Sequence, residues 1–109
     1  MQNPFYNDFY GKALIPAGLG DISFLGELGT EATHWFVAIE GRELTKRKYH
    51  EWRVHIFAAD RYGHFNANAP IFSTPYLNAF EEAMEEARSF EEEARNDKIS
   101  SLCLEEKIS

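Results

Sequence analysis

Residues 72–95 read FSTPYLNAFEEAMEEARSFEEEAR, and this stretch decides the fold. Its apolar residues recur every three or four positions, as they do on the buried face of an amphipathic helix. Ser73 or Thr74 suits the N-cap and Pro75 suits the first helical position, so we predict a long helix over residues 75–97. Its apolar arc holds Tyr76, Leu77, Phe80, Ala83, Met84, Ala87, Phe90 and Ala94, and its acidic arc holds Glu81, Glu82, Glu85, Glu86, Glu92 and Glu93.

Two stretches before this helix have the period-two alternation of half-buried β-strands, residues 33–40 and residues 51–59. A basic connection joins them, and Asp-Arg-Tyr-Gly at 60–63 predicts a tight turn into a third strand that Pro70 confines to a sheet edge. This turn predicts a register in which every facing pair is apolar. The predicted pairs are Ala58 with Phe65, Ile56 with Ala67, Val54 with Ala69, and Trp52 with Ile71.

The remaining segments complete a single predicted domain over residues 1–109. Residues 1–20 are aromatic and broken by Pro and Gly, which predicts an irregular segment. We expect a short strand beginning at Ile22 and Phe24, a sheet over 21–72, and a short turn or loose tail over 98–109. The predicted class is α+β: a three- to four-stranded antiparallel meander packed on one face by a long C-terminal amphipathic helix. The predicted core is Trp35, Val37, Ile39, Trp52, Val54, Ile56, Phe65, Ile71, Leu77, Phe80, Met84, Ala87 and Phe90.

Composition and charge limit the classes of function. The net charge is −7, of which residues 78–109 carry −6 and residues 41–61 carry +3. An acidic chain is poorly suited to duplex nucleic acid, and it favours a basic or nucleic-acid-binding protein as the partner. The single cysteine, Cys103, excludes an internal disulfide. Neither a membrane-spanning run nor a signal peptide is visible, so we expect a cytoplasmic protein without a membrane partner.

The six glutamates of the acidic arc form the first candidate site, which we call the acidic ridge: Glu81, Glu82, Glu85, Glu86, Glu92 and Glu93. Like charges four positions apart weaken a helix by a few tenths of a kcal/mol per pair. A repeating negative surface of this kind suits a groove built for nucleic-acid phosphates. The alternative interpretation is a solvated face that keeps a small protein soluble.

The outward face of the sheet forms the second candidate site. The predicted register places aromatic, Arg and His side chains together there, with Phe36, Arg53, His55 and Phe57 as the expected partner contacts. Such a face can anchor a protein interface or stack nucleic-acid bases. The alternative is that the aromatic N-terminal segment folds over this face and buries it. The residues predicted to share the face are His34, Phe36, Arg53, His55, Phe57, His64 and Asn66.

Other patterns carry weaker signals. The basic connection suits a phosphate or a base, but internal pairing explains it equally well; its residues are Arg42, Lys46, Arg47, Lys48, Tyr49 and His50. The four histidines have no H-x-x-x-H spacing, so neither a metal nor another cofactor is predicted. No glycine pattern matches a nucleotide-binding loop.

Three hypotheses for function follow from these patterns. The first is a non-enzymatic binding protein that docks on, and inhibits, a nucleic-acid-handling protein. In its size, acidity and lack of motifs the chain resembles the small inhibitors carried by phages and plasmids, such as anti-CRISPR and antirestriction proteins. The second is a housekeeping adaptor or homodimer that uses the sheet face or an edge strand. The third is a small enzyme with His55 or His34 as a general base.

Overall fold

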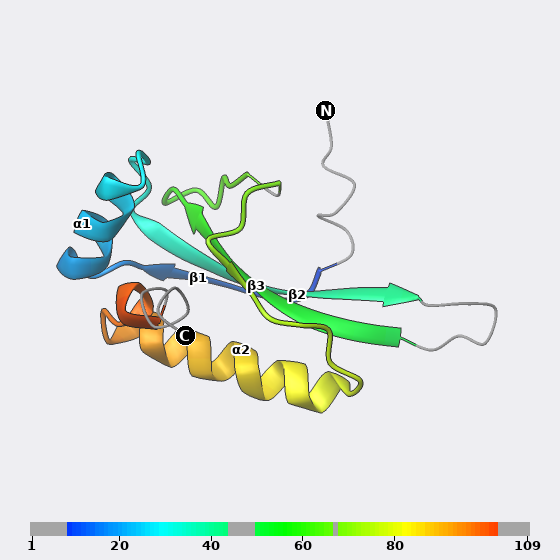
Figure 1. Ribbon diagram of the computed structural model, residues 1–109. Coiled ribbons are helices and arrows are strands. Elements are labelled where there is room, and N and C mark those ends of the chain that lie inside the picture. The colour runs from blue at the N-terminus through cyan, green and yellow to red at the C-terminus, as the bar shows by residue number, and fades with distance from the viewer. Residues whose placement is uncertain (1–8, 44–49, 67, 103–109) are drawn as a thin grey trace.

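The structure is a computed structural model that describes residues 9–43, 50–66 and 68–102. It confirms the α+β class with a four-stranded antiparallel sheet, and Figure 1 shows α2 running across one face of it. The strands follow one another in the order β1-β2-β3-β4. The elements are β1 (Phe9–Pro16), α1 (Leu19–Glu27), β2 (His34–Glu43), β3 (His50–Ala59), β4 (Phe72–Ser73) and α2 (Phe80–Arg95).

The two central strands confirm the alternation that predicted them. Trp35, Val37 and Ile39 of β2 lie on the α2 side of the sheet, and they face Ala58, Ile56 and Val54 of β3. The residues between them point to the opposite face, which we call the outer face. The sheet therefore separates two apolar clusters, one on each side.

The helix α2 is shorter than predicted, because it begins at Phe80 rather than at residue 75. Its N-cap is Ala79, and neither Ser73 nor Thr74 caps it. The preceding chain stays extended because Leu77 exchanges backbone hydrogen bonds of 2.9 and 2.6 Å with Trp52 of β3. The 16 residues of α2 span about 24 Å instead of the longer helix expected.

The register predicted from the 60–63 turn is wrong from its first pair, Ala58 with Phe65. The turn itself forms, but Phe65 pairs with Ala59 rather than with Ala58. The chain then leaves the sheet and returns only at β4, where Phe72 lies opposite Ile56. The apolar pairing expected for Ala69 and Ile71 is therefore replaced by a loop, and Ala67 lies outside the described residues.

The N-terminal third is more regular than predicted. Residues 9–16, expected to be irregular, form the edge strand β1, and the segment with Ile22 and Phe24 is the helix α1 rather than a strand. The proline in β1 is tolerated for a simple reason. The amide of Ala17 bonds to the carbonyl of Thr33 at the start of β2, so the neighbouring Pro16 has its nitrogen turned away from β2.

The main core lies between the sheet and α2, and it also includes Ile15, Leu25 and Ile99, which the sequence reading missed. Two predicted core residues lie elsewhere. Phe80 is 36% exposed, although it stacks edge-on against Trp52, and Phe65 belongs to the cluster on the outer face. The predicted core residues that are buried are Trp35, Val37, Ile39, Val54, Ile56, Ala87 and Phe90, and those partly buried against them are Trp52, Ile71, Leu77 and Met84.

Two aspartates join α1 to the short helical turn at residues 99–102, which lies in the segment predicted as a turn or tail. Asp97 accepts hydrogen bonds from the amides of Gly20 (2.9 Å) and Asp21 (2.7 Å) at the start of α1. The carboxylate of Asp21 accepts bonds from the amides of Ile99 (3.2 Å) and Ser100 (2.9 Å). Asp97 thus satisfies the first amides of α1, and Asp21 satisfies the first amides of the turn at residues 99–102. We call this arrangement the aspartate clasp.

Within the described residues, no helix has the length and apolar character that crossing a bilayer demands.

Candidate binding surfaces

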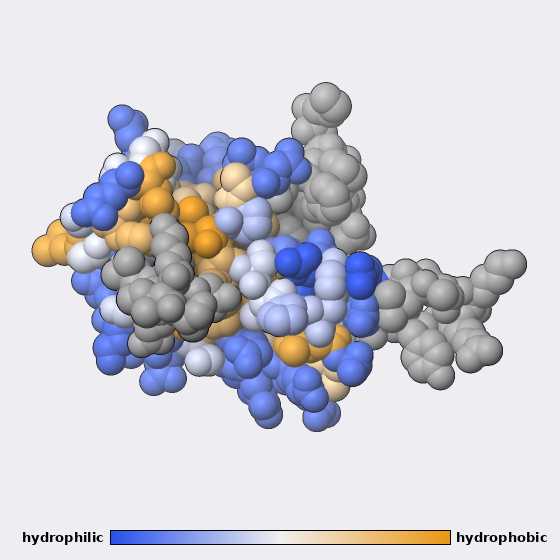
Figure 2. All heavy atoms as spheres, viewed as in Figure 1, coloured by the Kyte–Doolittle hydropathy of each residue, from blue (hydrophilic) through white to orange (hydrophobic). Residues whose placement is uncertain are grey.

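The acidic ridge is held in place by the buried side of its own helix. Ala83, Ala87, Phe90 and Ala94 of α2 are buried in the main core, which turns the opposite side of α2 toward solvent. Figure 2 shows this side as a hydrophilic border along the lower edge of the molecule. Five ridge glutamates are exposed and Glu93 is half-buried; the exposed ones are Glu81, Glu82, Glu85, Glu86 and Glu92.

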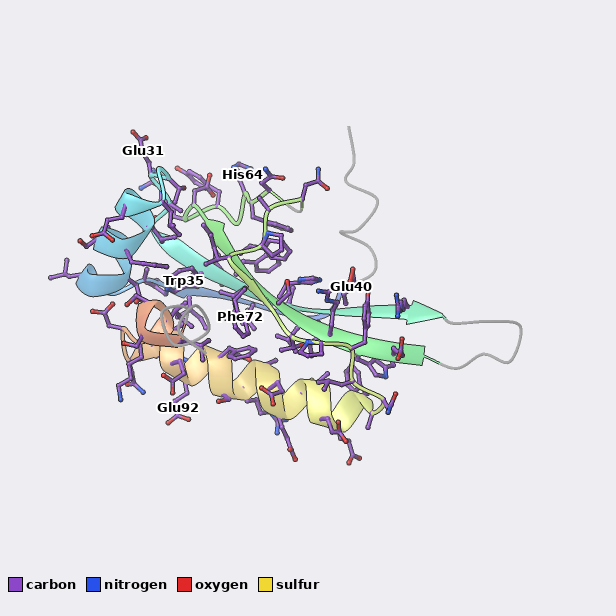
Figure 3. All side chains as sticks on the ribbon, in the orientation of Figure 1. Glu31, Trp35, Glu40, His64, Phe72 and Glu92 are labelled. Carbon is purple, nitrogen blue, oxygen red and sulfur yellow. The ribbon has the colours of Figure 1, made fainter. Side chains whose placement is uncertain are left out.

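The ridge carboxylates have no cationic partner among the described residues. The ion pair found on α2 joins Arg95 to Glu91 at 3.5 Å, and Glu91 is not a ridge residue. The label of Glu92 in Figure 3 marks a side chain that points away from the sheet. The structure therefore places five of these carboxylates on the solvent side, as expected from the sequence, and none of the six forms an ion pair with a described residue.

The aromatic side chains of the outer face are not exposed as the sequence analysis expected. Phe36 is 7% exposed and Phe57 is 1% exposed, and Phe65 lies over both, with ring centroids 4.5 and 4.7 Å away. The loop after the 60–63 turn brings Phe65 to this position. In this conformation Phe36 and Phe57 are core residues of a second cluster, and a partner would have to displace Phe65 to reach them.

His55, also expected at an exposed surface, is 8% exposed and lies in a chain of polar contacts. Its Nε2 is 3.2 Å from Oε1 of Glu40, and its Nδ1 is 2.6 Å from Oγ of Ser73. Because a carboxylate only accepts hydrogen bonds, Nε2 donates to Glu40, and Nδ1 of the neutral ring accepts from the Ser73 hydroxyl. Serine hydrolases use the same sequence of carboxylate, histidine and serine to activate the serine. In their triads Nδ1 faces the carboxylate and Nε2 faces the serine, whereas here Nε2 faces Glu40 and Nδ1 faces Ser73.

Beside this chain, two arginines contact one tyrosine ring. The guanidinium carbon of Arg42 lies 3.6 Å from the centroid of Tyr76, and that of Arg53 lies 4.7 Å from it. Arg42 donates two hydrogen bonds to Glu51 (3.1 and 2.7 Å), which raise the pKa of Arg42. Of the basic connection, Arg42 is thus internally paired, whereas Lys46, Arg47, Lys48 and Tyr49 lie outside the described residues, as does the side chain of His50.

The burial of His55 leads to a prediction for stability against pH. Burial lowers the pKa of His55 and outweighs the opposing effect of Glu40, while Arg53 lowers it further. The unfolded chain, with a histidine pKa near 6.5, then binds the proton first as the pH falls. The free energy of unfolding should therefore decrease from pH 7.5 to pH 5.5, with a slope from this group of at most about 1.4 kcal/mol per pH unit.

Urea unfolding at both pH values measures this decrease. The His55→Gln variant should lose that component of the slope, whereas His34→Gln should retain it, because His34 lies outside this cluster and bonds to Thr33. A slope that is unchanged in His55→Gln would show that another group is responsible.

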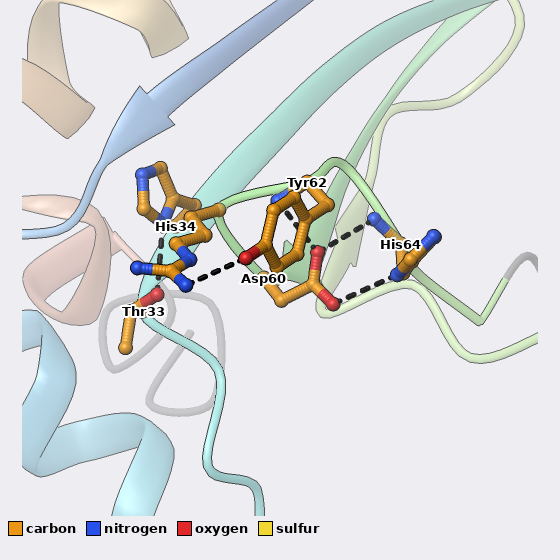
Figure 4. A network of polar contacts seen from close by, with 6 residues as sticks. Thr33, His34, Asp60, Tyr62 and His64 are labelled. Carbon is orange, nitrogen blue, oxygen red and sulfur yellow. Dashed lines mark hydrogen bonds and ion pairs between the residues drawn. The ribbon is translucent and has the colours of Figure 1, made fainter.

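The remaining histidine, His64, lies in the turn that Figure 4 shows. Asp60 accepts bonds from the amides of Tyr62 (2.8 Å) and His64 (2.9 Å) and contacts Nδ1 of His64 at 3.0 Å. These bonds, chiefly the one from the His64 amide, lower the pKa of Asp60. The turn borders an open groove of about 740 Å³ whose walls include Leu28, Ala58 and Ile71.

Three histidines were expected on one face, but the structure does not bring them together into a site. Within residues 9–43, 50–66 and 68–102, no three His, Cys, Asp or Glu side chains converge as metal ligands would. No family model, curated protein or solved structure matches the chain.

The sequence reading missed Glu40, Ser73 and Tyr76, which join Arg53 and His55 in the polar cluster of the outer face. Glu40 and Arg53 lie directly opposite each other on β2 and β3, so the strand alternation alone could have paired them. Ser73 and Tyr76 had been assigned to the start of the helix, and this assignment hid their contribution.

Proposed function

We propose that this protein is a non-enzymatic binding protein whose acidic ridge docks on a basic surface of a nucleic-acid-handling protein and inhibits it. The observation that carries the proposal is the row of ridge carboxylates without a cationic partner in the described chain. Because the buried face of α2 fixes the helix, these charges are presented without a cost for ordering a flexible segment.

The spacing of the charges supports the same function. Residues four apart on a helix lie about 6 Å apart along its axis, and the ridge extends over about 18 Å from Glu81 to Glu93. A strip of this length can cover several cations of a groove that otherwise binds phosphates, and it can steer the association of the two proteins. The buried Phe36, His55 and Phe57 are not part of the docking surface that we propose.

A matched pair of charge reversals tests this proposal. The double variant Glu82→Lys/Glu86→Lys changes the ridge, and Glu27→Lys/Glu31→Lys makes the same change of four charge units on exposed residues outside α2. We expect the ridge variant to lose about 100-fold in affinity for the partner at low salt, because both attraction and steering are reversed. The control variant should lose much less.

The partner for this measurement is obtained by affinity purification from the native host, with the wild-type protein and both variants as baits. The purified partner is then assayed for nucleic-acid binding or cleavage with each variant present. Equal affinity of the two double variants would remove the ridge from the interface. A partner that binds through the ridge but keeps its full activity would contradict inhibition.

A further inference from the structure

Arg53 is a cation on the outer face for which the described chain supplies no anion. Its side chain is half-buried, and its Nε is buried without a hydrogen-bond acceptor. No carboxylate oxygen of the described residues forms an ion pair with it, although Glu40 lies opposite it on the neighbouring strand. Buried polar groups in proteins are nearly always partnered, and leaving one unpaired is costly, most of all when it is charged.

The neighbouring acids are already engaged. Oε1 of Glu40 accepts from Nε2 of His55 and from the hydroxyl of Tyr76, and Oε1 of Glu51 accepts two bonds from Arg42. In Figure 3, Glu40 lies on the strand pair beside the chain that follows β4. Both carboxylates are thus oriented by other donors, and neither forms an ion pair with Arg53 in the structure.

A second guanidinium, that of Arg42, lies beside Arg53 and is paired with Glu51. Arg42 contacts the same Tyr76 ring as Arg53, and its side chain is 49% exposed, so solvent and solutes can reach this end of the cluster. A guanidinium presents a planar fork of donors that matches the two oxygens of a phosphate or a carboxylate. Two guanidiniums on one ring thus provide hydrogen-bond donors for a single oxyanion, and Arg53 is the one without a carboxylate partner among the described residues.

We propose that Arg53, assisted by Arg42 and Tyr76, forms a binding site for an oxyanion, either a phosphate group or a carboxylate. Binding requires a small movement of the Arg53 side chain, because Nε is buried in the free protein. The anion then replaces the missing acceptor. This site is separate from the acidic ridge, and its test needs only the isolated protein.

Thermal unfolding in phosphate, in acetate and in chloride at equal ionic strength and pH tests the proposal. A ligand that binds only the folded protein raises Tm with its concentration, so we expect a saturable rise in phosphate or in acetate that chloride does not produce. The anion that produces the rise identifies the oxyanion class. In Arg53→Met the apparent affinity should fall about tenfold or more, while Met keeps an apolar side chain against Tyr76. The control Arg88→Met, on the exposed side of α2, should respond as the wild type does.

A second measurement on the wild-type protein does not depend on the folding of any variant. An anion at Arg53 cancels part of the positive field that acts on His55, so the pKa of His55 followed by NMR should rise when the anion is added. The proposal is overturned if neither anion gives a saturable response, if Arg53→Met responds as strongly as the wild type, or if the pKa of His55 stays constant at saturation.

Discussion

Replacing Asp21 with alanine is expected to lower the free energy of unfolding by about 3–5 kcal/mol. The Asp21 carboxylate is fully buried, and it accepts hydrogen bonds from the indole nitrogen of Trp35 (3.0 Å) and from the amides of Ile99 and Ser100. Its removal leaves three donors unpaired inside the protein, where water cannot replace the lost oxygens. For a chain of this size, the corresponding decrease in Tm is roughly 15 °C or more.

Chemical denaturation followed by tryptophan fluorescence measures this effect, since Trp35 contacts the substituted position. The control is Glu27→Ala, which removes an exposed carboxylate from the last turn of the same helix and should change stability by about 0.5 kcal/mol or less. A loss of less than about 1 kcal/mol in Asp21→Ala would mean that the carboxylate is not the shared cap that the structure shows.

Replacing Gly18 or Gly26 with alanine should change the free energy of unfolding in opposite directions. A Cβ atom at Gly18 would lie 2.5 Å from Cγ of Asp97, and Asp97 cannot retreat without losing its bonds to the amides of Gly20 and Asp21. At Gly26, in the last turn of α1, a Cβ atom meets nothing within 4 Å. We expect Gly18→Ala to cost about 2 kcal/mol or more and Gly26→Ala to stabilise the protein by about 0.5–1 kcal/mol.

Urea unfolding of both variants measures the difference, and a double-mutant cycle assigns its cause. Because the clash at Gly18 is with the Asp97 side chain, Gly18→Ala should cost much less when Asp97→Ala is also present. Additive losses in the double variant would place the strain elsewhere, for example in the N-cap conformation of Gly18 itself.

The sequence was sufficient to predict the strands and the helix whose buried side is visible as a local pattern of apolar residues. Alternation of Trp35, Val37 and Ile39 was sufficient for β2, and the spacing of Ala83, Ala87 and Phe90 was sufficient for the body of α2. The start of α2 was placed too early because the pairing of Leu77 with Trp52 satisfies backbone groups more fully than a capped helical turn would. This pairing depends on two segments distant in sequence, and no local pattern reveals it.

The candidate surfaces follow the same rule. The ridge carboxylates were placed correctly because helical periodicity fixes which side of α2 faces water. The outer face was misjudged because the position of Phe65 over Phe36 depends on the path of a loop. Asp21 offered no signal at all, since its carboxylate caps Ile99 and Ser100, which lie 78 and 79 residues later in the chain.

The aspartate clasp also has a consequence for how the protein is made. During synthesis on the ribosome, α1 emerges early, but its N-terminal amides have no cap until Asp97 has been added and has left the exit tunnel. Until that point the nascent chain carries α1 without the acceptors for the amides of Gly20 and Asp21. A chain interrupted before Asp97 would therefore lack the contact that fixes the start of α1 to the segment after α2.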